Sequence, residues 1–207
     1  MNRLVSVVVG VMGMAFVASA APVSFSDDAF SGASGQSSFT SEEYGITLTA
    51  SPEGAELTRS SDGIGVDYSR LNDWFGGLIK IPDDLPYEID YPEVLTISFD
   101  KDVNLESVYI SNLFTDGFVL WREKGLYELS TGEIGEFITE NQNGELTLSI
   151  NKTVSSISFT AKEGSFLGML HDFSVSGVSY TSVPEPTLLS LLGMSLLGLG
   201  FMRNRKK

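Results

Sequence analysis

A single histidine is the first feature that could do chemistry. His171 is the only histidine in the 207 residues, and Asp172 follows it directly. A Ser-His-Asp triad would have to combine this pair with a serine such as Ser165. No Gly-x-Ser-x-Gly nucleophile elbow accompanies these residues. A lone histidine near the start of a strand is more typical of a structural residue, so the sequence predicts no catalytic residue.

Carboxylates suggest two other kinds of site. Glu88 with Asp90 or Glu93 could form the acid pair of a glycosidase, because such pairs are defined by spatial separation rather than by sequence spacing. Solvated turn charges are the commoner explanation. Calcium, which prefers oxygen ligands, could be held at strand ends by Asp62, Asp67, Glu88 and Asp90. Calcium is the one cofactor that these residues leave open.

The segment Asp100-Lys101-Asp102-Val103-Asn104 also places oxygen ligands at alternate positions. It lacks the central glycine and the distant bidentate glutamate of an EF-hand. We therefore do not predict a calcium loop there.

Exposed aromatic rings are a further type of binding site. Trp74 and Phe75 precede two glycines in a loop-like stretch, with Tyr68 and Tyr87 nearby. Aromatic rings on the rim of a sandwich offer sugars a flat apolar contact with a polar edge. The alternative is that Trp74 and Phe75 cap the hydrophobic core. The sequence leaves both interpretations open.

Short strands must position these residues. Apolar residues alternate with serine or threonine in most of the candidate strands, which indicates one buried and one solvated face. These strands are 44–50, 94–99, 108–110, 118–121, 146–150, 157–160 and 173–180. Turn chemistry separates them at 51–54, 82–84, 116–117 and 141–144, and Asn143-Gly144 is the strongest hairpin signal. The pattern predicts an all-β fold, a single β-sandwich of jelly-roll type.

The charge of the central segment excludes one class of partner. Residues 21–186 contain all 27 acidic residues but only eight of the 13 basic ones, a net charge of −19. A basic face for nucleic acid or anionic lipid is therefore not expected. The chain has no cysteine, so the fold must depend on its core rather than on disulfides.

The N-terminus has the organisation of a secretory signal peptide. Arg3 is a minimal basic region, residues 4–17 are apolar, and Ala18-Ser19-Ala20 forms an A-x-A cleavage site. We predict cleavage after Ala20.

The C-terminus contains three consecutive features. Val183-Pro184-Glu185-Pro186 comes first, and its prolines favour an extended, accessible conformation. An uncharged run at 187–202 follows, which as a helix would extend roughly 24 Å. Snorkelling of the basic residues that follow it can extend this short span across a membrane. Those basic residues, Arg203, Arg205, Lys206 and Lys207, should stay cytoplasmic.

These three features together resemble the PEP-CTERM sorting domain of Gram-negative bacteria. The resemblance implies that an exosortase, a membrane-embedded transpeptidase or protease, recognises residues 183–207 and cuts near the motif. The alternative is an ordinary membrane anchor that no enzyme processes. A second resemblance is to the exported β-sandwich domains that precede such tails, and it implies a surface or matrix module without a defined ligand. It is carried by residues 62–67, 88–90 and 93–99 and by the later pattern Val103, Leu105, Val108 and Ile110.

The predicted organisation is a signal peptide at 1–20, an exported domain at 21–182 and a sorting signal at 183–207. We expect a noncatalytic protein of the cell surface or extracellular matrix that associates with exopolysaccharide. Its expected partners are exosortase, exopolysaccharide and, before processing, the membrane. An exported hydrolase acting on glycans is the alternative.

Overall fold

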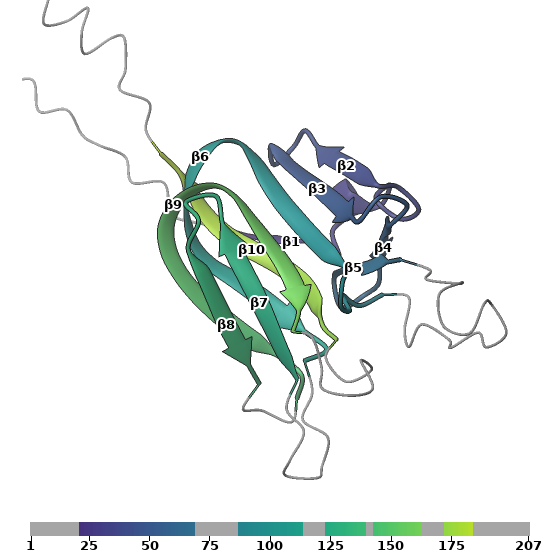
Figure 1. The fold of residues 1–207 in the computed structure, drawn as a ribbon. Coiled ribbons are helices and arrows are strands. Elements are labelled where there is room, and N and C mark those ends of the chain that lie inside the picture. Colours follow the sequence, from purple (N-terminus) through teal and green to yellow (C-terminus); the bar gives the residue numbers. More distant parts are fainter. Residues whose placement is uncertain (1–20, 69–86, 114–122, 140–142, 163–171, 184–207) are drawn as a thin grey trace, which may run out of the picture.

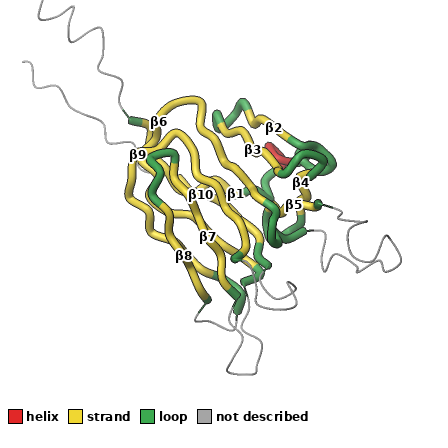
Figure 2. The backbone as a smooth tube through the Cα atoms, viewed as in Figure 1, coloured by secondary structure: helices red, strands yellow, loops and turns green. Residues whose placement is uncertain are grey.

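Most of the segments predicted from alternating apolar and hydroxyl side chains lie in strands of the protein. The computed structural model describes residues 21–68, 87–113, 123–139, 143–162 and 172–183. Within these ranges the chain forms antiparallel strands and one short 3-10 helix, η1 (Asp28–Phe30) (Figure 2). The strands are β1 (Ala21–Ser24), β2 (Ser38–Ser41), β3 (Ile46–Ser51), β4 (Glu56–Arg59), β5 (Ile64–Asp67), β6 (Val94–Ser111), β7 (Lys124–Leu129), β8 (Ile134–Ile138), β9 (Leu146–Ala161) and β10 (Ser174–Ser182). The predicted all-β class is confirmed.

The two longest strands, β6 and β9, form the centre of the sheet. The first half of β6 pairs with β3, and its second half pairs with β10. Strand β9 pairs with both halves of β6, and its own second half also pairs with β7. The strands thus form one sheet in the order β4-β5-β10-β6-β9-β7-β8, with β1 on β10 and β2-β3 on β6 (Figure 1).

This continuous sheet folds over onto itself. Phe137 lies on β8 and Phe173 directly precedes β10, four strands away in the sheet order. Strands in a flat sheet at about 4.8 Å spacing would separate these two rings by roughly 19 Å. Their centroids are instead 5.0 Å apart. The two halves therefore pack face to face as a β-sandwich built from one sheet.

The hydrophobic core lies between the two halves. Both halves of β6 contribute to it, through Leu95 and Ile97 from the first and Val108 and Ile110 from the second. Other members that are fully buried include Phe25, Phe30, Leu48, Ile64, Ile157, Phe159 and Val175. Removing this apolar surface from water is the main driving force for folding, as expected for a domain without disulfides.

Two pairs of predicted strands are in fact single bent strands. The segments 94–99 and 108–110 both belong to β6, and 146–150 and 157–160 both belong to β9. The two strands bend at the same place along their pairing. The register between them is interrupted from Ser98 to Val103 of β6, and Asn151 of β9 has a left-handed φ of 51°. Asp100, Lys101 and Asp102 form the exposed bend of β6. The predicted strand 118–121 lies outside the described residues.

The hairpin predicted at Asn143-Gly144 is wrong. Strand β9, which follows it, pairs with β6 and β7, whereas β8, which precedes it, pairs with β7. Gly144 does adopt the left-handed φ of 73° that turn glycines favour. Its carbonyl accepts a hydrogen bond from the N–H of Leu113. Local turn chemistry was therefore identified correctly, but the strands that the turn connects are not neighbours.

Both ends of the described chain leave from the same end of the sandwich. Ala21 at the start of β1 pairs with Tyr180 near the end of β10 (Figure 1). The Tyr180 hydroxyl donates a 2.7 Å hydrogen bond to the carbonyl of Tyr44, and burial raises the pKa of this hydroxyl. The packing of β10 against the core thus extends to Tyr180, whereas Ser182 and Val183 are exposed.

The tail beyond Val183 and the predicted signal peptide both lie outside the described residues. Within the described part of the chain, no helix has the length and apolarity needed to cross a membrane.

Candidate functional site

A polar groove opens on the domain away from the end where the termini leave. Its volume is about 730 Å³, and five segments line it. They are Ser24 and Ser26, the turn residues Ser61 and Asp62, Tyr109 to Asn112, Asn143 to Thr147, and Ser176. Ser176 lies near the start of β10 and Ser182 at its end, which is roughly 20 Å of extended strand. The groove is therefore distant from the exit of the tail.

Strand alternation explains why Tyr109 faces the groove. Val108 and Ile110 on either side of it are buried in the core, so Tyr109 points to the opposite face of the sheet. Thr147 on β9 is its directly paired neighbour, and Thr147 is exposed. An aromatic ring and a hydroxyl group thus lie side by side on the floor of the groove.

Hydrogen bonds fix one wall of the groove. The Ser111 hydroxyl at the end of β6 donates a 2.6 Å hydrogen bond to the carbonyl of Asp62. Gly63, with φ 145°, lets the same turn approach β10 closely, because a Cβ there would lie 2.4 Å from the carbonyl oxygen of Val175. These contacts hold the main chain of Asp62 in place, and the residue is nevertheless exposed to solvent.

Arg59 fixes the neighbouring segment of the groove lining. Its guanidinium group on β4 donates to the backbone carbonyls of Phe25, Ser26 and Asp27. These residues follow β1, so the segment that carries Ser24 and Ser26 is attached to the body of the domain. The hydroxyl groups of Ser24 and Ser26 are 2.8 Å apart and hydrogen-bonded to each other. These two segments of the lining are preorganised, which reduces the ordering cost of binding a ligand.

The lining of the groove favours an uncharged or positively charged ligand rich in hydroxyl groups. Asp62 and Glu145 are exposed carboxylates on its rim, and serine, threonine and asparagine supply donors and acceptors. Among the residues that the structure describes, no lysine or arginine lines it. The groove thus combines a tyrosine ring, several hydroxyl and amide groups, and negative charge.

The carboxylates that suggested a glycosidase do not line this groove, and one of them, Glu93, has a structural role. Both oxygens of Glu93 are used, because they accept hydrogen bonds from the backbone N–H groups of Tyr68 and Asp90. Glu93 is only 3% exposed and Glu88 only 7%. Glu93 therefore ties together the two chain segments, at 68 and at 90, that flank residues 69–86. This is a structural role for a buried carboxylate.

The four residues proposed as calcium ligands do not form one group. Asp62 lies at the groove, Asp67 ends β5, and Glu88 and Asp90 belong to the segment before β6. In the described ranges, no three Asp, Glu, His or Cys residues are placed to hold a metal ion. The geometry therefore gives no support to calcium at these four residues.

Several other predicted residues lie outside the described part of the chain. They are Trp74, Phe75, Ser165, His171, Pro184, Glu185, Pro186 and the terminal basic residues, together with Ala18 and Ala20. Asp172 is described and is partly buried just before β10. The groove itself was not predicted, because its lining comes from five separate segments and Tyr109 is one residue of an ordinary alternating strand.

Comparisons with known proteins give no family. No protein-family model matches the chain, and no curated protein matches it. One similar solved structure is the family 32 carbohydrate-binding module from C. perfringens NanJ in complex with galactose, at 17% identity and a TM-score of 0.34, covering 64% of this chain and 93% of that one. Another is the arabinofuranosyltransferase AftD from Mycobacteria, at 11% identity and a TM-score of 0.33, covering 67% of this chain and 11% of that one. Likenesses at these TM-scores do not assign the fold or the function.

Proposed function

We propose that this is an exported, noncatalytic protein of the bacterial surface or extracellular matrix that associates with exopolysaccharide. Residues 1–20 direct its export as a signal peptide. Residues 183–207, the segment that resembles a PEP-CTERM domain, direct its sorting by an exosortase. The sandwich between them is the working module.

The observation that carries this proposal is the position of the tail relative to the fold. Strand β10 ends at Ser182, and the sequence Val183-Pro184-Glu185-Pro186 begins at the next residue. Val183 is exposed, so the start of the motif is accessible next to the folded domain. An address that follows the last strand directly can be recognised, and removed, without disturbing the core.

The location of the groove supports a role in binding at the surface. The groove opens near the start of β10, whereas the tail leaves after its end. A domain that is attached through its C-terminus would therefore present the groove away from the membrane. This arrangement suits contact with a polysaccharide layer outside the cell.

Fractionation of cells tests the sorting part of the proposal. Deleting residues 203–207, or substituting Glu185→Ala, should retain the protein in the inner membrane and reduce its amount at the surface. The melting temperature of the exported domain should stay within about 1 °C, because these residues lie beyond β10 and 1 kcal/mol would shift it by roughly 2–4 °C. Normal surface release of both variants would count against an enzyme that reads this signal.

Activity screening separates this proposal from the alternative of an exported glycan hydrolase. The exported domain is incubated with the polysaccharides of its own cells and with standard glycans. Turnover that is abolished by one carboxylate substitution would establish the hydrolase. Binding without turnover is the result that we expect.

A further inference from the structure

We infer that the groove around Tyr109 is a glycan-binding site that selects sugars carrying a free amino group over N-acetylated and acidic sugars. The inference rests on the proposed function and deepens it by naming the place of binding and the class of sugar.

The floor and walls of the groove match the two surfaces of a sugar. Tyr109 offers a ring face for the apolar C–H surface of a hexose. Thr147 and Ser26 are exposed, and their hydroxyl groups can pair with those of a sugar. The volume of about 730 Å³ lies within the usual range for small-molecule sites, roughly 300–1,000 Å³. A short stretch of a glycan chain therefore fits the groove in both size and chemistry.

The charge of the groove determines which sugar is favoured. Asp62 and Glu145 contribute exposed carboxylates on different walls, one from the β4–β5 turn and one from the start of β9. Hydrogen bonds from an ammonium group to a carboxylate are charge-assisted and stronger than neutral ones. N-acetylation removes this positive charge, and a uronic acid would add a like charge. The order of affinity should therefore be amino sugar, then N-acetylated sugar, then acidic sugar.

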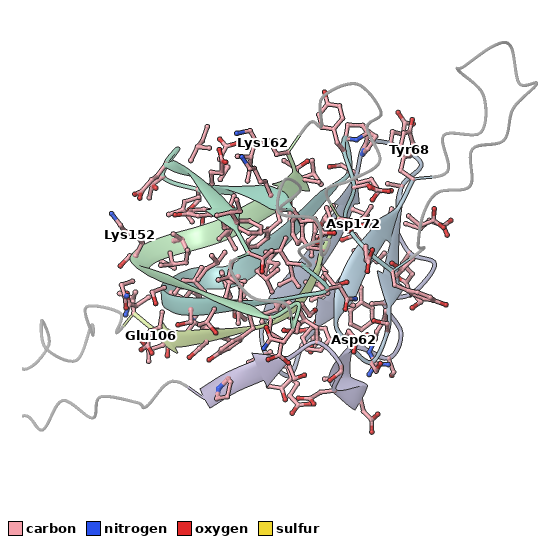
Figure 3. All side chains as sticks on the ribbon, turned by 90° about the horizontal axis from the view of Figure 1, so that it is seen from below. Asp62, Tyr68, Glu106, Lys152, Lys162 and Asp172 are labelled. Atoms are coloured by element: carbon pink, nitrogen blue, oxygen red, sulfur yellow. The ribbon has the colours of Figure 1, made fainter. Side chains whose placement is uncertain are left out.

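We expect the preference for amino sugars to come from the two carboxylates at the groove rather than from the negative charge of the whole domain. Asp62 is positioned by the bond from Ser111 to its carbonyl, and its carboxylate is exposed and accepts a 3.3 Å hydrogen bond from the exposed Ser61 hydroxyl. Glu106 is also partly exposed but lies at the other end of the domain, towards the exits of the two termini (Figure 3). Asp102 is exposed next to Val103, which pairs with Ser182 at that same end. These two acids are matched controls for the groove acids.

Calorimetric titration provides the test. The protein purified from its own cells, in the processed form that they contain, is titrated with a hexamer of β-1,4-linked glucosamine, with its fully N-acetylated counterpart and with a guluronate hexamer. We expect the glucosamine hexamer to bind about tenfold more tightly than the N-acetylated one, and the guluronate hexamer not to bind. Equal affinity for the first two would overturn the selectivity.

Variants that remove only the negative charge of a side chain test whether the groove is the binding site. The double variant Asp62→Asn/Glu145→Gln should weaken binding of the glucosamine hexamer by about tenfold and should leave the N-acetylated hexamer unchanged. The control Asp102→Asn/Glu106→Gln changes the net charge equally and should leave both affinities unchanged. An equal loss in both double variants would show attraction by the general negative field and would overturn the inference.

Substitutions of two separate tyrosines test whether the ring of Tyr109 contacts the sugar. Tyr109→Leu keeps an apolar side chain but removes the flat ring, and it should weaken both hexamers. The control Tyr91→Leu removes a ring that is 47% exposed and is not part of the groove lining, and it should have no effect. Unchanged binding in Tyr109→Leu, with an unchanged melting temperature, would exclude the groove as the site.

The same protein samples are also tested for retention on the exopolysaccharide of their own cells. Retention without preference for the amino sugar would overturn this inference and leave the proposed function standing. Absence of both retention and hexamer binding would overturn the proposed function as well.

Discussion

Gly177 on β10 allows β1 to approach closely, and replacing it should loosen the groove. A Cβ at this position would lie 2.3 Å from the carbonyl oxygen of Val23 and 3.3 Å from the Cα of Ser24. Ordinary contact between such atoms requires at least about 3.2 Å, so β1 would have to move by roughly 1 Å. Backbone atoms cannot rotate away as a flexible side chain can. The substitution Gly177→Ala therefore acts directly on the pairing of β1 with β10.

The cost follows from what holds β1 in place. Its pairing covers four residues, Val23 is 5% exposed, and the N–H of Phe25 donates a 2.9 Å bond to the carbonyl of Ser176. Overpacking of this kind costs about 1–3 kcal/mol. A domain of this size loses roughly 2–4 °C per kcal/mol, so the melting temperature should fall by about 5 °C. Because Ser24 and Ser26 form a wall of the groove, glycan binding should weaken as well.

Thermal denaturation, amide hydrogen exchange and calorimetry measure these effects on the exported domain. The amides of residues 23–25 should lose protection while those of β6 and β9 keep theirs. Gly132→Ala is the control, because no atom lies within 4 Å of its Cβ position. Its φ of 82° should cost about 1 kcal/mol without affecting the groove. A Gly177→Ala protein with native stability and native binding would contradict this close packing of β1 on β10.

Three further predictions concern single positions. Glu93→Ala should destabilise the domain by about 3 kcal/mol in urea denaturation, because two partly buried N–H groups lose their acceptor on a buried carboxylate. Glu93→Gln should cost less because it keeps one oxygen, and equal costs would exclude this explanation. Gly125→Ala should cost about 2 kcal/mol, because its Cβ would lie 2.1 Å from the buried ring of Phe137; an unchanged melting temperature would contradict this packing. Trp74→Ala should destabilise the domain by about 3–5 kcal/mol if the ring caps the core. Loss of exopolysaccharide retention at native stability would instead identify a sugar platform. Native stability together with native retention would exclude this loop from either role.

The alternation of residues predicted the strands better than it predicted their continuity. Val94 to Phe99 and Val108 to Ile110 are in strand as expected, but the polar residues 100–102 resemble a turn. They form a bend because β9 bends beside them, with residues 151–153 exposed on the partner strand. A partner fifty residues away in sequence is not visible in a local pattern.

The β7–β8 hairpin shows a second limit of local patterns. Gly125 pairs with Phe137, and Tyr127 pairs with Gly135, so each glycine lies opposite an aromatic ring. Glycine weakens an isolated strand, but a ring from the neighbouring strand can cover it. The strand propensity of these segments thus depends on their pairing. The groove escaped prediction for the same reason, since its acids and its tyrosine become neighbours only after folding.

Intact-mass measurement of the protein recovered from the cell surface tests the central claim most directly. We expect a species that begins at Ala21 and lacks the residues after the Pro-Glu-Pro region, because both end segments serve only as addresses for a domain whose last strand ends at Ser182. A surface-exposed species that retains residues 187–207 would contradict processing at the tail and would leave only a membrane anchor.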